Sequence, residues 1–373
     1  MEPELLDLPF FEESHRRFAA ELRGWAGAQM IDATDPDTVC VQWVRALAEG
    51  KWLDSAGELE VRKLCITREI LAYHDALADF AFAMQGLGSA PVTLFGTKEQ
   101  KHDLLAAVTS GKTIPAFALT EREAGSDVAA IDTRARRDGG DYVLDGEKAW
   151  ISNAGIAGVY VVFARTADSG AKGLSAFIVD AQMPGVSVTQ RVETISPHPL
   201  GCVRLERVRV PRDARIGEEG DGFKIAMATL DVFRSTVGAA AIGFGRRALD
   251  ETLAHVKSRK LFGSPLSALQ LTQSKIAHVA TDLDAASLLV YRAAYVKDSG
   301  RARITREAAM AKWFATEAAS RAADEAVQLF GARGVSRGEI VERLYRDVRA
   351  LRIYEGASEI QQVVIARSLV DAR

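Results

Sequence analysis

The stretch FALTEREAGSD (Phe117–Asp127) marks the point where the texture of the chain changes. An apolar start runs into the Thr120 hydroxyl and then into a Gly125-Ser126-Asp127 turn. Such a turn exposes backbone N–H groups and short hydroxyls, which suit phosphate groups and the polar edges of a bound ring system. The same residues also fit an ordinary loop in which Ser126 or Asp127 caps a short helix. Local chemistry alone leaves both interpretations open.

Upstream of this stretch, residues 1–113 are predicted to form an N-terminal helical domain. Apolar residues recur at three- and four-residue steps between Phe11 and Trp25, which is typical of one buried helix face. The Ala-, Leu- and Phe-rich run from Glu69 to Met84 indicates a buried helix, and Glu99 to Val108 indicates a shorter amphipathic one.

Residues 114–216 are predicted to form a small antiparallel β middle domain. Short β-prone runs cover Val159–Phe163 and Leu174–Val179, and Tyr142-Val143-Leu144 leads into an Asp-Gly turn. The alternation from Val203 to Val210 breaks parity once, which predicts a bulge or turn.

Residues 217–373 are predicted to form a C-terminal four-helix-bundle domain. Long helical patterns cover Phe223 to Lys257, Ala268 to Val296 and Thr305 to Leu329. Small residues between Gly238 and Gly245 allow close helix packing. The fold class is therefore α+β multidomain, with helices on either side of a β domain in the sequence.

Composition excludes several classes of protein. A net charge of -3 gives no basic field for nucleic acid, and 48% hydrophobic with 26% charged residues fits a globular chain. The acidic start lacks the features of a signal or transit peptide, and no apolar stretch is long and uninterrupted enough to predict membrane insertion. Three scattered cysteines and six scattered histidines predict no metal site, and the cysteines favour a reducing compartment. We expect a bacterial-type cytoplasm, with a processed organellar protein as the alternative.

From Ala118 to Ala130 the chain resembles the first signature of the acyl-CoA dehydrogenase family, and the order of predicted domains is the order found in that family. The resemblance extends over about the whole chain and is weakest over the first 90 residues. It implies the acyl-CoA dehydrogenase-like fold and the cofactor FAD. It also implies FAD contacts from the signature at Phe117, Leu119, Thr120, Gly125 and Ser126.

Further segments resemble FAD-binding parts of the family. The run GEKAWISN (Gly146–Asn153) resembles the strand that packs against the flavin, which implies contacts from Trp150, Ile151 and Ser152. The segment after Arg259 resembles the Arg-x-x-Phe-Gly segment that reaches FAD bound mainly by a neighbouring subunit. On the residues alone, Trp150 also fits a core position, and Arg259 and Phe262 also fit a surface arginine and a core phenylalanine. The further contacts implied in this half of the chain are Arg259, Phe262, Gln273, Gln328, Gly331, Ala357, Ser358 and Glu359.

The segment IYEGASEIQ (Ile353–Gln361) resembles the family's catalytic segment, in which the Glu of Tyr-Glu-Gly is the base. Taken alone, Glu355 fits better a residue that caps the following helix and complements its dipole. Phe233 stands where some branches of the family carry the base on the long helix, which favours Glu355. The resemblance implies substrate contacts from Ser126, Arg234, Tyr354 and Gly356. Arg234 also fits an internal salt bridge with Asp231.

The sequence departs from the family pattern at several positions. Ala357 replaces the more usual Thr, and Ala332 and Gly338 replace usual residues of the second signature, which begins at Gln328. Residues 195–201 and 52–70 lack the family's usual runs. His198, in the first of these segments, is predicted to be a packing or hydrogen-bonding residue rather than a catalytic one.

The resemblance implies α,β-dehydrogenation of an acyl thioester, acyl-CoA to trans-2-enoyl-CoA, with Glu355 removing the α-proton and flavin N5 accepting the β-hydride. It also implies a homo-oligomer, either a tetramer or a dimer, and an electron-transfer flavoprotein as acceptor. The alternatives are an acyl-CoA oxidase, a flavin monooxygenase, an enzyme of thioesters on acyl carrier protein, and an inactive scaffold. Retained Glu355 argues against the monooxygenase, which does not need that base.

Overall fold

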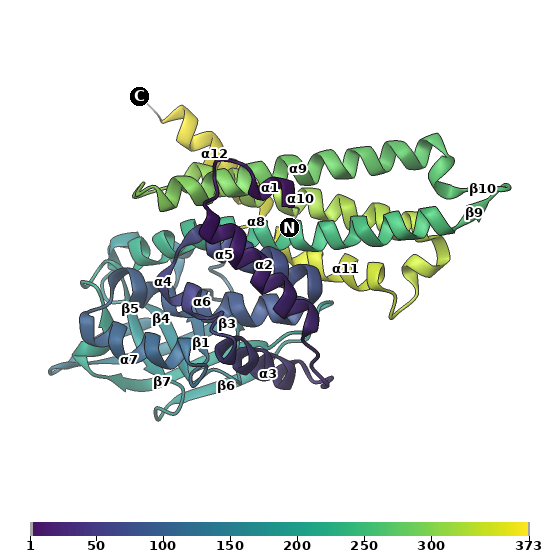
Figure 1. Ribbon diagram of the computed structural model, residues 1–373. Helices are drawn as coiled ribbons and strands as arrows, with labels where there is room; N and C mark the ends of the chain where they lie inside the picture. Colours follow the sequence, from purple (N-terminus) through teal and green to yellow (C-terminus); the bar gives the residue numbers. More distant parts are fainter. Residues whose placement is uncertain (1–2, 372–373) are drawn as a thin grey trace. The chain divides into compact units, whose positions relative to one another are not determined.

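The computed structural model describes residues 3–371, which form two compact units. Of these residues, the helical unit comprises those up to Gln29, Val61–Asp79 and those from Asp231 onwards, and the sheet unit comprises Met30–Glu60 and Phe80–Leu230. Figure 1 shows the chain from its N-terminal helices through the sheet to the long C-terminal helices. Two helices, α6 (Ala76–Phe95) and α8 (Gly222–Ser258), run from one unit into the other.

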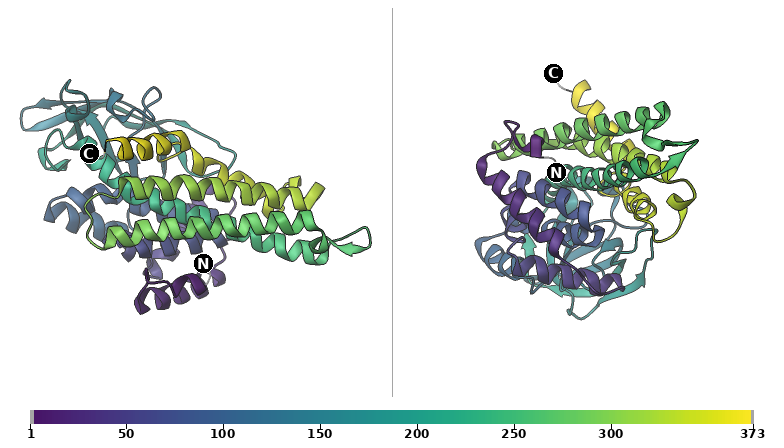
Figure 2. Two further views of the ribbon diagram at one scale, coloured as in Figure 1. Left: turned by 90° about the horizontal axis from the view of Figure 1, so that it is seen from above. Right: turned by 45° about the vertical axis from the view of Figure 1, so that its right-hand side comes forward.

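The helical unit is built on the long helices predicted from the sequence. Most of α8 runs beside α9 (Gln270–Asp298) and α10 (Thr305–Phe330), as both views in Figure 2 show. The remaining helices and the small hairpin of this unit are α1 (Pro3–Leu6), α2 (Glu13–Ala28), α5 (Val61–His74), β9 (Lys260–Leu261), β10 (Ser264–Pro265), α11 (Ile340–Arg349) and α12 (Ser358–Val370).

Small residues on α8 permit the close approach that the sequence predicted. A Cβ atom at Gly238 would lie 2.7 Å from Val290 of α9, and one at Gly245 would lie 2.5 Å from Leu283. At Gly243 the Cβ would lie 2.2 Å from the backbone oxygen of Glu69 in α5. Side chains at these positions would push the helices apart, because packed interiors leave no space for an added methyl group.

The single helix expected from Glu69 to Met84 is wrong in one respect, because the structure divides it at Asp75. Helix α5 ends at His74, and the Asp75 carboxylate then accepts hydrogen bonds from the N–H groups of Leu77 and Ala78 at 2.9 and 3.0 Å. A side-chain acceptor at this position satisfies donors that a new helix leaves free, so α6 begins there.

The sheet unit contains an eight-stranded sheet with the order β6-β7-β3-β2-β4-β5-β8, and β1 pairs with β4 beside this path. Most pairings are antiparallel, as expected, while β1 and β2 each pair with β4 in parallel. The strands are β1 (Pro115–Ala118), β2 (Arg134–Asp138), β3 (Asp141–Ser152), β4 (Val159–Arg165), β5 (Leu174–Asp180), β6 (Val186–Arg191), β7 (Leu200–Val210) and β8 (Arg215–Ile216). The helices that lie wholly in this unit are α3 (Pro36–Glu49), α4 (Asp54–Glu58) and α7 (Lys98–Thr109).

The parity break predicted in β7 is a bulge in the pairing with β3. The register shifts between Leu144 and Gly146, and Arg207 adopts a φ of 51°. Gly146 has a φ of 152°, and a Cβ there would lie 2.6 Å from the Thr133 hydroxyl, so glycine is required.

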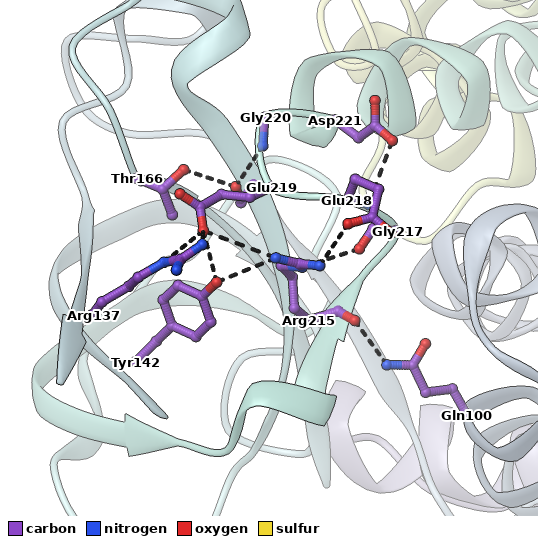
Figure 3. A network of polar contacts seen from close by, with 11 residues as sticks. Gln100, Arg137, Tyr142, Thr166, Arg215, Gly217, Glu218, Glu219, Gly220 and Asp221 are labelled. Atoms are coloured by element: carbon purple, nitrogen blue, oxygen red, sulfur yellow. Dashed lines mark hydrogen bonds and ion pairs between the residues drawn. The ribbon is translucent and has the colours of Figure 1, made fainter. Parts of the chain in front are cut away.

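A polar network fixes the loop between β8 and α8. One oxygen of Glu219 accepts hydrogen bonds from Arg137 Nη2 at 2.6 Å and from the Tyr142 hydroxyl at 2.8 Å. Arg215 reaches Glu218 at 2.8 Å, and its carbonyl accepts from Gln100 of α7 at 2.9 Å. Figure 3 shows these side chains converging on the loop from the sheet and from α7.

Helix α8 is long and apolar enough, by length and composition, to cross a membrane. However, 89% of its apolar window is buried within the protein, as expected of a core helix. The three cysteines Cys40, Cys65 and Cys202 are buried, and none of them forms a disulfide.

Candidate functional site

Glu355 lies in a short irregular segment between the 3-10 helix η6 (Ala350–Arg352) and α12. Its φ of 54° lies in the left-handed region, which side chains other than glycine rarely adopt. Ala357 is the N-cap of α12, and no side chain caps this helix. The capping interpretation of Glu355 is therefore wrong, and the strained backbone has to be held by neighbouring groups.

Glu355 is half-buried within the helical unit. Its Oε2 atom is buried and has no hydrogen-bond partner within residues 3–371. Burial raises the pKa of this carboxyl above its usual range. The positive charges of Arg68, Lys312 and Arg234 oppose that rise without cancelling it, and the Asp79 carboxylate adds to it. A carboxylate that is costly to keep charged and has a free oxygen is well suited to accept a proton.

Three buried side chains hold the backbone of the Glu355 segment. The Glu355 carbonyl accepts from Arg234 Nε of α8 and from Gln361 Nε2 of α12, each at 3.3 Å. The Gly356 carbonyl accepts from Lys312 Nζ of α10 at 2.7 Å and from Gln361 Nε2 at 2.9 Å. Gly356 has a φ of 93°, and a Cβ there would lie 2.4 Å from Gln361 Nε2. The segment requires glycine because of its backbone angle and the close approach of Gln361.

The internal ion pair expected of Arg234 is present, and the same side chain also reaches the Glu355 segment. Its Nη1 atom lies 3.4 Å from Asp231 Oδ1, while its Nε atom reaches the Glu355 carbonyl. Asp231 in turn accepts from Arg303 and Thr305, so this carboxylate is shared among several donors. Arg234 thus links the internal ion pair to the Glu355 segment.

A second buried ion pair lies in the same unit and was not singled out from the sequence. Arg68 of α5 and Asp79 of α6 form two hydrogen bonds of 2.8 Å, and Arg68 also donates to Thr236 of α8 at 3.1 Å. Burial and the Asp79 carboxylate raise the pKa of Tyr354, and the positive charge of Arg68 opposes that rise. The signals in the sequence were isolated charges within apolar helical patterns, namely Arg68, Asp79 and Lys312.

The signature loop in the sheet unit is fixed by a buried lysine. Lys148 of β3 donates to Glu121 Oε1 at 2.7 Å and to the Leu119 carbonyl at 3.1 Å. Glu121 also accepts from the backbone N–H groups of Asp132 and Thr133. These bonds hold the turn so that Gly125 and Ser126 remain exposed. Asp127 precedes a 3-10 helix but its side chain makes no capping bond, so the alternative of a simple capped loop lacks support.

Trp150 is exposed rather than buried in the core. Its relative exposure is 53%, and its φ of 58° turns the chain out of regular β geometry. The neighbouring Ile151 is 1% exposed and Leu119 is 5% exposed, so their side chains belong to the core and only their backbone groups are available to a ligand. Phe117, Thr120 and Ser152 are half-buried.

The remaining implied FAD contacts lie at two ends of the helical unit. The β9–β10 hairpin carries Phe262, which is 97% exposed, and Arg259 is also exposed, so the core interpretation of Phe262 is wrong. Gln273 is exposed on α9, Gln328 is exposed on α10, and Gly331 ends α10 with a φ of 63°. At the start of α12, Glu359 is exposed, whereas the buried Ser358 hydroxyl donates to Glu317 at 2.6 Å. Ser358 therefore offers a ligand its backbone rather than its hydroxyl.

His198 is a packing residue, as predicted. Its ring lies 4.8 Å from that of Phe80, its Nδ1 atom lies 2.8 Å from the Ser196 carbonyl, and burial lowers its pKa.

The donor set fits a flavin nucleotide. In the sheet unit, the exposed indole of Trp150 offers a face for stacking, and the turn at Gly125 and Ser126 offers hydroxyl and N–H donors. In the helical unit, the exposed Arg259 is suited to bind a pyrophosphate. An exposed aromatic face beside donors of this kind is typical of the nucleotide-binding surface of a flavoprotein oxidoreductase.

Comparisons with known proteins give the family. Residues 116–208 match the family model described as "Acyl-CoA dehydrogenase, middle domain", and residues 220–370 match "Acyl-CoA dehydrogenase, C-terminal domain". The chain is 36% identical over 362 residues to a cyclohexane-1-carbonyl-CoA dehydrogenase of Geobacter metallireducens, and the alignment covers 95% of each chain. The protein belongs to the acyl-CoA dehydrogenase family.

Solved structures agree with this assignment. Butyryl-CoA dehydrogenase from Megasphaera elsdenii superposes with a TM-score of 0.90 and 31% identity, covering 96% of this chain and 99% of the other. A glutaryl-CoA dehydrogenase from Mycobacterium smegmatis in complex with FADH2 superposes with a TM-score of 0.81 and 26% identity, covering 97% and 96%. The chain is thus an acyl-CoA dehydrogenase by family and fold, an oxidoreductase acting on CH–CH groups.

Proposed function

We propose that this protein carries out FAD-dependent α,β-dehydrogenation of an acyl-CoA, with Glu355 as the base that removes the α-proton. The observation that carries the proposal is the buried Glu355 Oε2 atom, which has no hydrogen-bond partner within residues 3–371. An unpaired carboxylate oxygen in an enclosed site is unfavourable unless the site uses it. A raised pKa makes the carboxylate a stronger base towards a weakly acidic carbon.

Bound FAD would supply the two-electron acceptor that takes the β-hydrogen as hydride. Residues fitted to hold it in the sheet unit are the exposed Trp150 and the Thr120 to Ser126 turn. In the helical unit, Arg259 and Phe262 are fitted to reach FAD bound mainly by a neighbouring subunit, and Gln328 is fitted to a place beside the adenine end of FAD. The protein's own step is removal of the α-proton: the C–H bond breaks, Glu355 Oε2 gains the proton, and the electron pair forms the α,β double bond as the hydride leaves.

The developing negative charge on the thioester oxygen requires a donor that is already in place. Within the described residues the Glu355 N–H group donates no hydrogen bond, so it is free to donate to that oxygen. Arg234, Lys312 and Gln361 fix the carbonyls on the other side of Glu355, and this keeps the N–H and the carboxylate in one fixed arrangement.

We further propose that the active form is a homo-oligomer and that an electron-transfer flavoprotein reoxidises the flavin. Phe262, at 97% exposure on a projecting hairpin, is an unusual surface residue for a protein that works as a single chain. Size-exclusion chromatography with light scattering tests the first proposal, and a single-chain mass would contradict it. Stopped-flow reoxidation with purified electron-transfer flavoprotein tests the second, and flavin that stays reduced would contradict it.

The central test is an anaerobic titration of the flavin with straight-chain, branched and cyclic acyl-CoAs, run on wild type and on Glu355→Gln. We expect at least one thioester to bleach the wild-type flavin, and we expect the variant to lose about 10²- to 10⁴-fold in rate. Bleaching that survives in Glu355→Gln would refute the base. Bleaching by no thioester in the panel would refute the substrate class, and steady-state hydrogen peroxide would identify an oxidase instead.

A further inference from the structure

Lys312 is a fully buried lysine whose ammonium group has one hydrogen-bond acceptor among residues 3–371. Its side chain has 0% relative exposure on α10, and its Nζ atom lies 2.7 Å from the Gly356 carbonyl. Burying an ammonium group is costly, and burial lowers the pKa of this one to about 8. The cost of burying this ammonium group suggests that Lys312 has a functional role. Its acceptor, the Gly356 carbonyl, belongs to the residue that follows Glu355.

Donors from three helices bind the carbonyls of Glu355 and Gly356, and Lys312 is one of them. Lys312 of α10 and Gln361 of α12 meet at the Gly356 carbonyl, while Gln361 and Arg234 of α8 meet at the Glu355 carbonyl. Both of these residues have positive φ angles, 54° and 93°. Without the donors, the segment would relax towards ordinary backbone geometry, because such conformations are retained only where the surroundings impose them.

Lys312 differs from Gln361 in carrying charge beside the carboxylate. The charged groups that act on Glu355 come from four helices, namely Arg68 of α5, Asp79 of α6, Arg234 of α8 and Lys312 of α10. Glu317 and Glu359 act on Lys312 as well. Removal of Lys312 therefore removes both a hydrogen bond and a cation, whereas removal of the Gln361 amide removes hydrogen bonds alone.

We propose that Lys312 is a positioning residue for proton abstraction: by donating to the Gly356 carbonyl it holds Glu355 in its strained backbone conformation, and its charge favours the ionised base. This inference rests on the proposed role of Glu355 and extends it to a residue that does not touch the substrate. It predicts that Lys312 governs the α-proton step and contributes little to the affinity for the thioester.

The test measures α-proton exchange rather than overall turnover. The probe is the 3-thia analogue of the acyl-CoA that bleaches the wild-type flavin fastest, in which sulfur replaces the β-carbon, so that no β-hydrogen can follow the α-proton. Holoenzymes of wild type, Lys312→Met and Gln361→Met are incubated with the probe in D₂O, and loss of the α-CH₂ signal is followed by proton NMR. Bound FAD per chain and the thermal midpoint are recorded for each variant.

We expect Lys312→Met to slow exchange by about 10²-fold, the loss that follows displacement of a catalytic group by about 1 Å. Gln361→Met should slow it by about fivefold, as for loss of a neutral hydrogen bond. The dissociation constant of the probe should change little in either variant. Lys297→Met is the matched control, since Lys297 also donates to a backbone carbonyl, that of Ala302 at 3.0 Å, in the connection between α9 and α10. Exchange by the control should match wild type.

The pH profile separates a positioning charge from a merely structural lysine. With the cation gone, Glu355 takes up a proton more readily, so the acid limb of the exchange profile should move to higher pH in Lys312→Met and stay in place in Gln361→Met. Wild-type exchange rates and an unshifted limb in Lys312→Met would overturn the inference. If Lys312→Met fails to fold, the inference is overturned when Gln361→Met exchanges the α-proton as fast as wild type. A wild-type flavin that no thioester of the panel bleaches would instead overturn the proposed function.

Discussion

Arg68 and Asp79 form a buried ion pair with two hydrogen bonds of 2.8 Å, and their side chains are only 3% and 5% exposed. The pair joins α5 to α6 across the break at Asp75, and Thr236 of α8 accepts a third bond from Arg68 at 3.1 Å. Arg68 is also the strongest of the cations that favour ionised Glu355. One guanidinium thus serves both the junction of three helices and the electrostatics of the candidate base.

Replacement of Arg68 by methionine should destabilise the protein by about 3–5 kcal/mol, because it leaves the Asp79 carboxylate buried without its partner. Urea denaturation followed by far-UV circular dichroism measures this change. The double variant Arg68→Met/Asp79→Leu should recover much of the loss, because no unpaired charge then remains. A double variant no more stable than Arg68→Met would contradict the explanation that the loss of stability comes from an unpaired Asp79 carboxylate.

Replacement of Lys148 by methionine should loosen the signature turn in the sheet unit. Lys148 has 0% exposure, burial lowers its pKa to about 8, and it joins Glu121 to the Leu119 carbonyl. We expect faster hydrogen exchange in residues 119–127 and weaker FAD binding, since the donors of the turn lose their fixed arrangement. In Arg122→Ala, which alters the exposed neighbour of Glu121, exchange in this segment should be close to that of wild type. Equal exchange in wild type and Lys148→Met would contradict the role of the lysine.

Most of the architecture could be predicted from periodicity. The long apolar patterns gave α8, α9 and α10 nearly to their ends, and the parity break between Leu205 and Val208 located a real bulge. The break of the helix at Asp75 was missed because the flanking residues continue a helical pattern. It depends on a side-chain cap, which is a weak signal within an Ala-rich run.

The candidate site could be predicted only where short motifs carried it. Glu355 and Trp150 lie within recognisable segments, but Lys312 and Arg68 lie in helices where a lone charge resembles any solvent-facing residue. Their role depends on which helices meet, and local sequence does not determine that. The exposure of Phe262 likewise follows from tertiary structure, since its residue type favoured the core.

The raised pKa of Glu355 should be visible as a pH-dependent stability. In the folded state this carboxyl holds its proton to higher pH than in the unfolded chain, where the pKa is about 4.3. The wild type therefore loses stability as pH rises from that value through the folded pKa, and the loss is constant above it. Glu355→Gln lacks this loss, so its stability advantage over wild type should be larger at pH 8 than at pH 5 in urea denaturation. An advantage independent of pH would contradict a raised pKa.

Trp150 offers a way to separate flavin binding from folding, because it is 53% exposed and makes a limited contribution to the core. If its indole packs against the flavin, Trp150→Ala should weaken FAD binding by about 2- to 10-fold, which corresponds to the loss of one aromatic contact. The thermal midpoint of the apoprotein should remain close to that of wild type, since little buried area is lost. Trp150→Phe keeps an aromatic face and should restore most of the affinity, while the φ of 58° remains for both substitutions and so cancels from their comparison. Fluorescence titration of apoprotein with FAD measures the affinity, and equal dissociation constants for wild type and Trp150→Ala would place the flavin away from this strand.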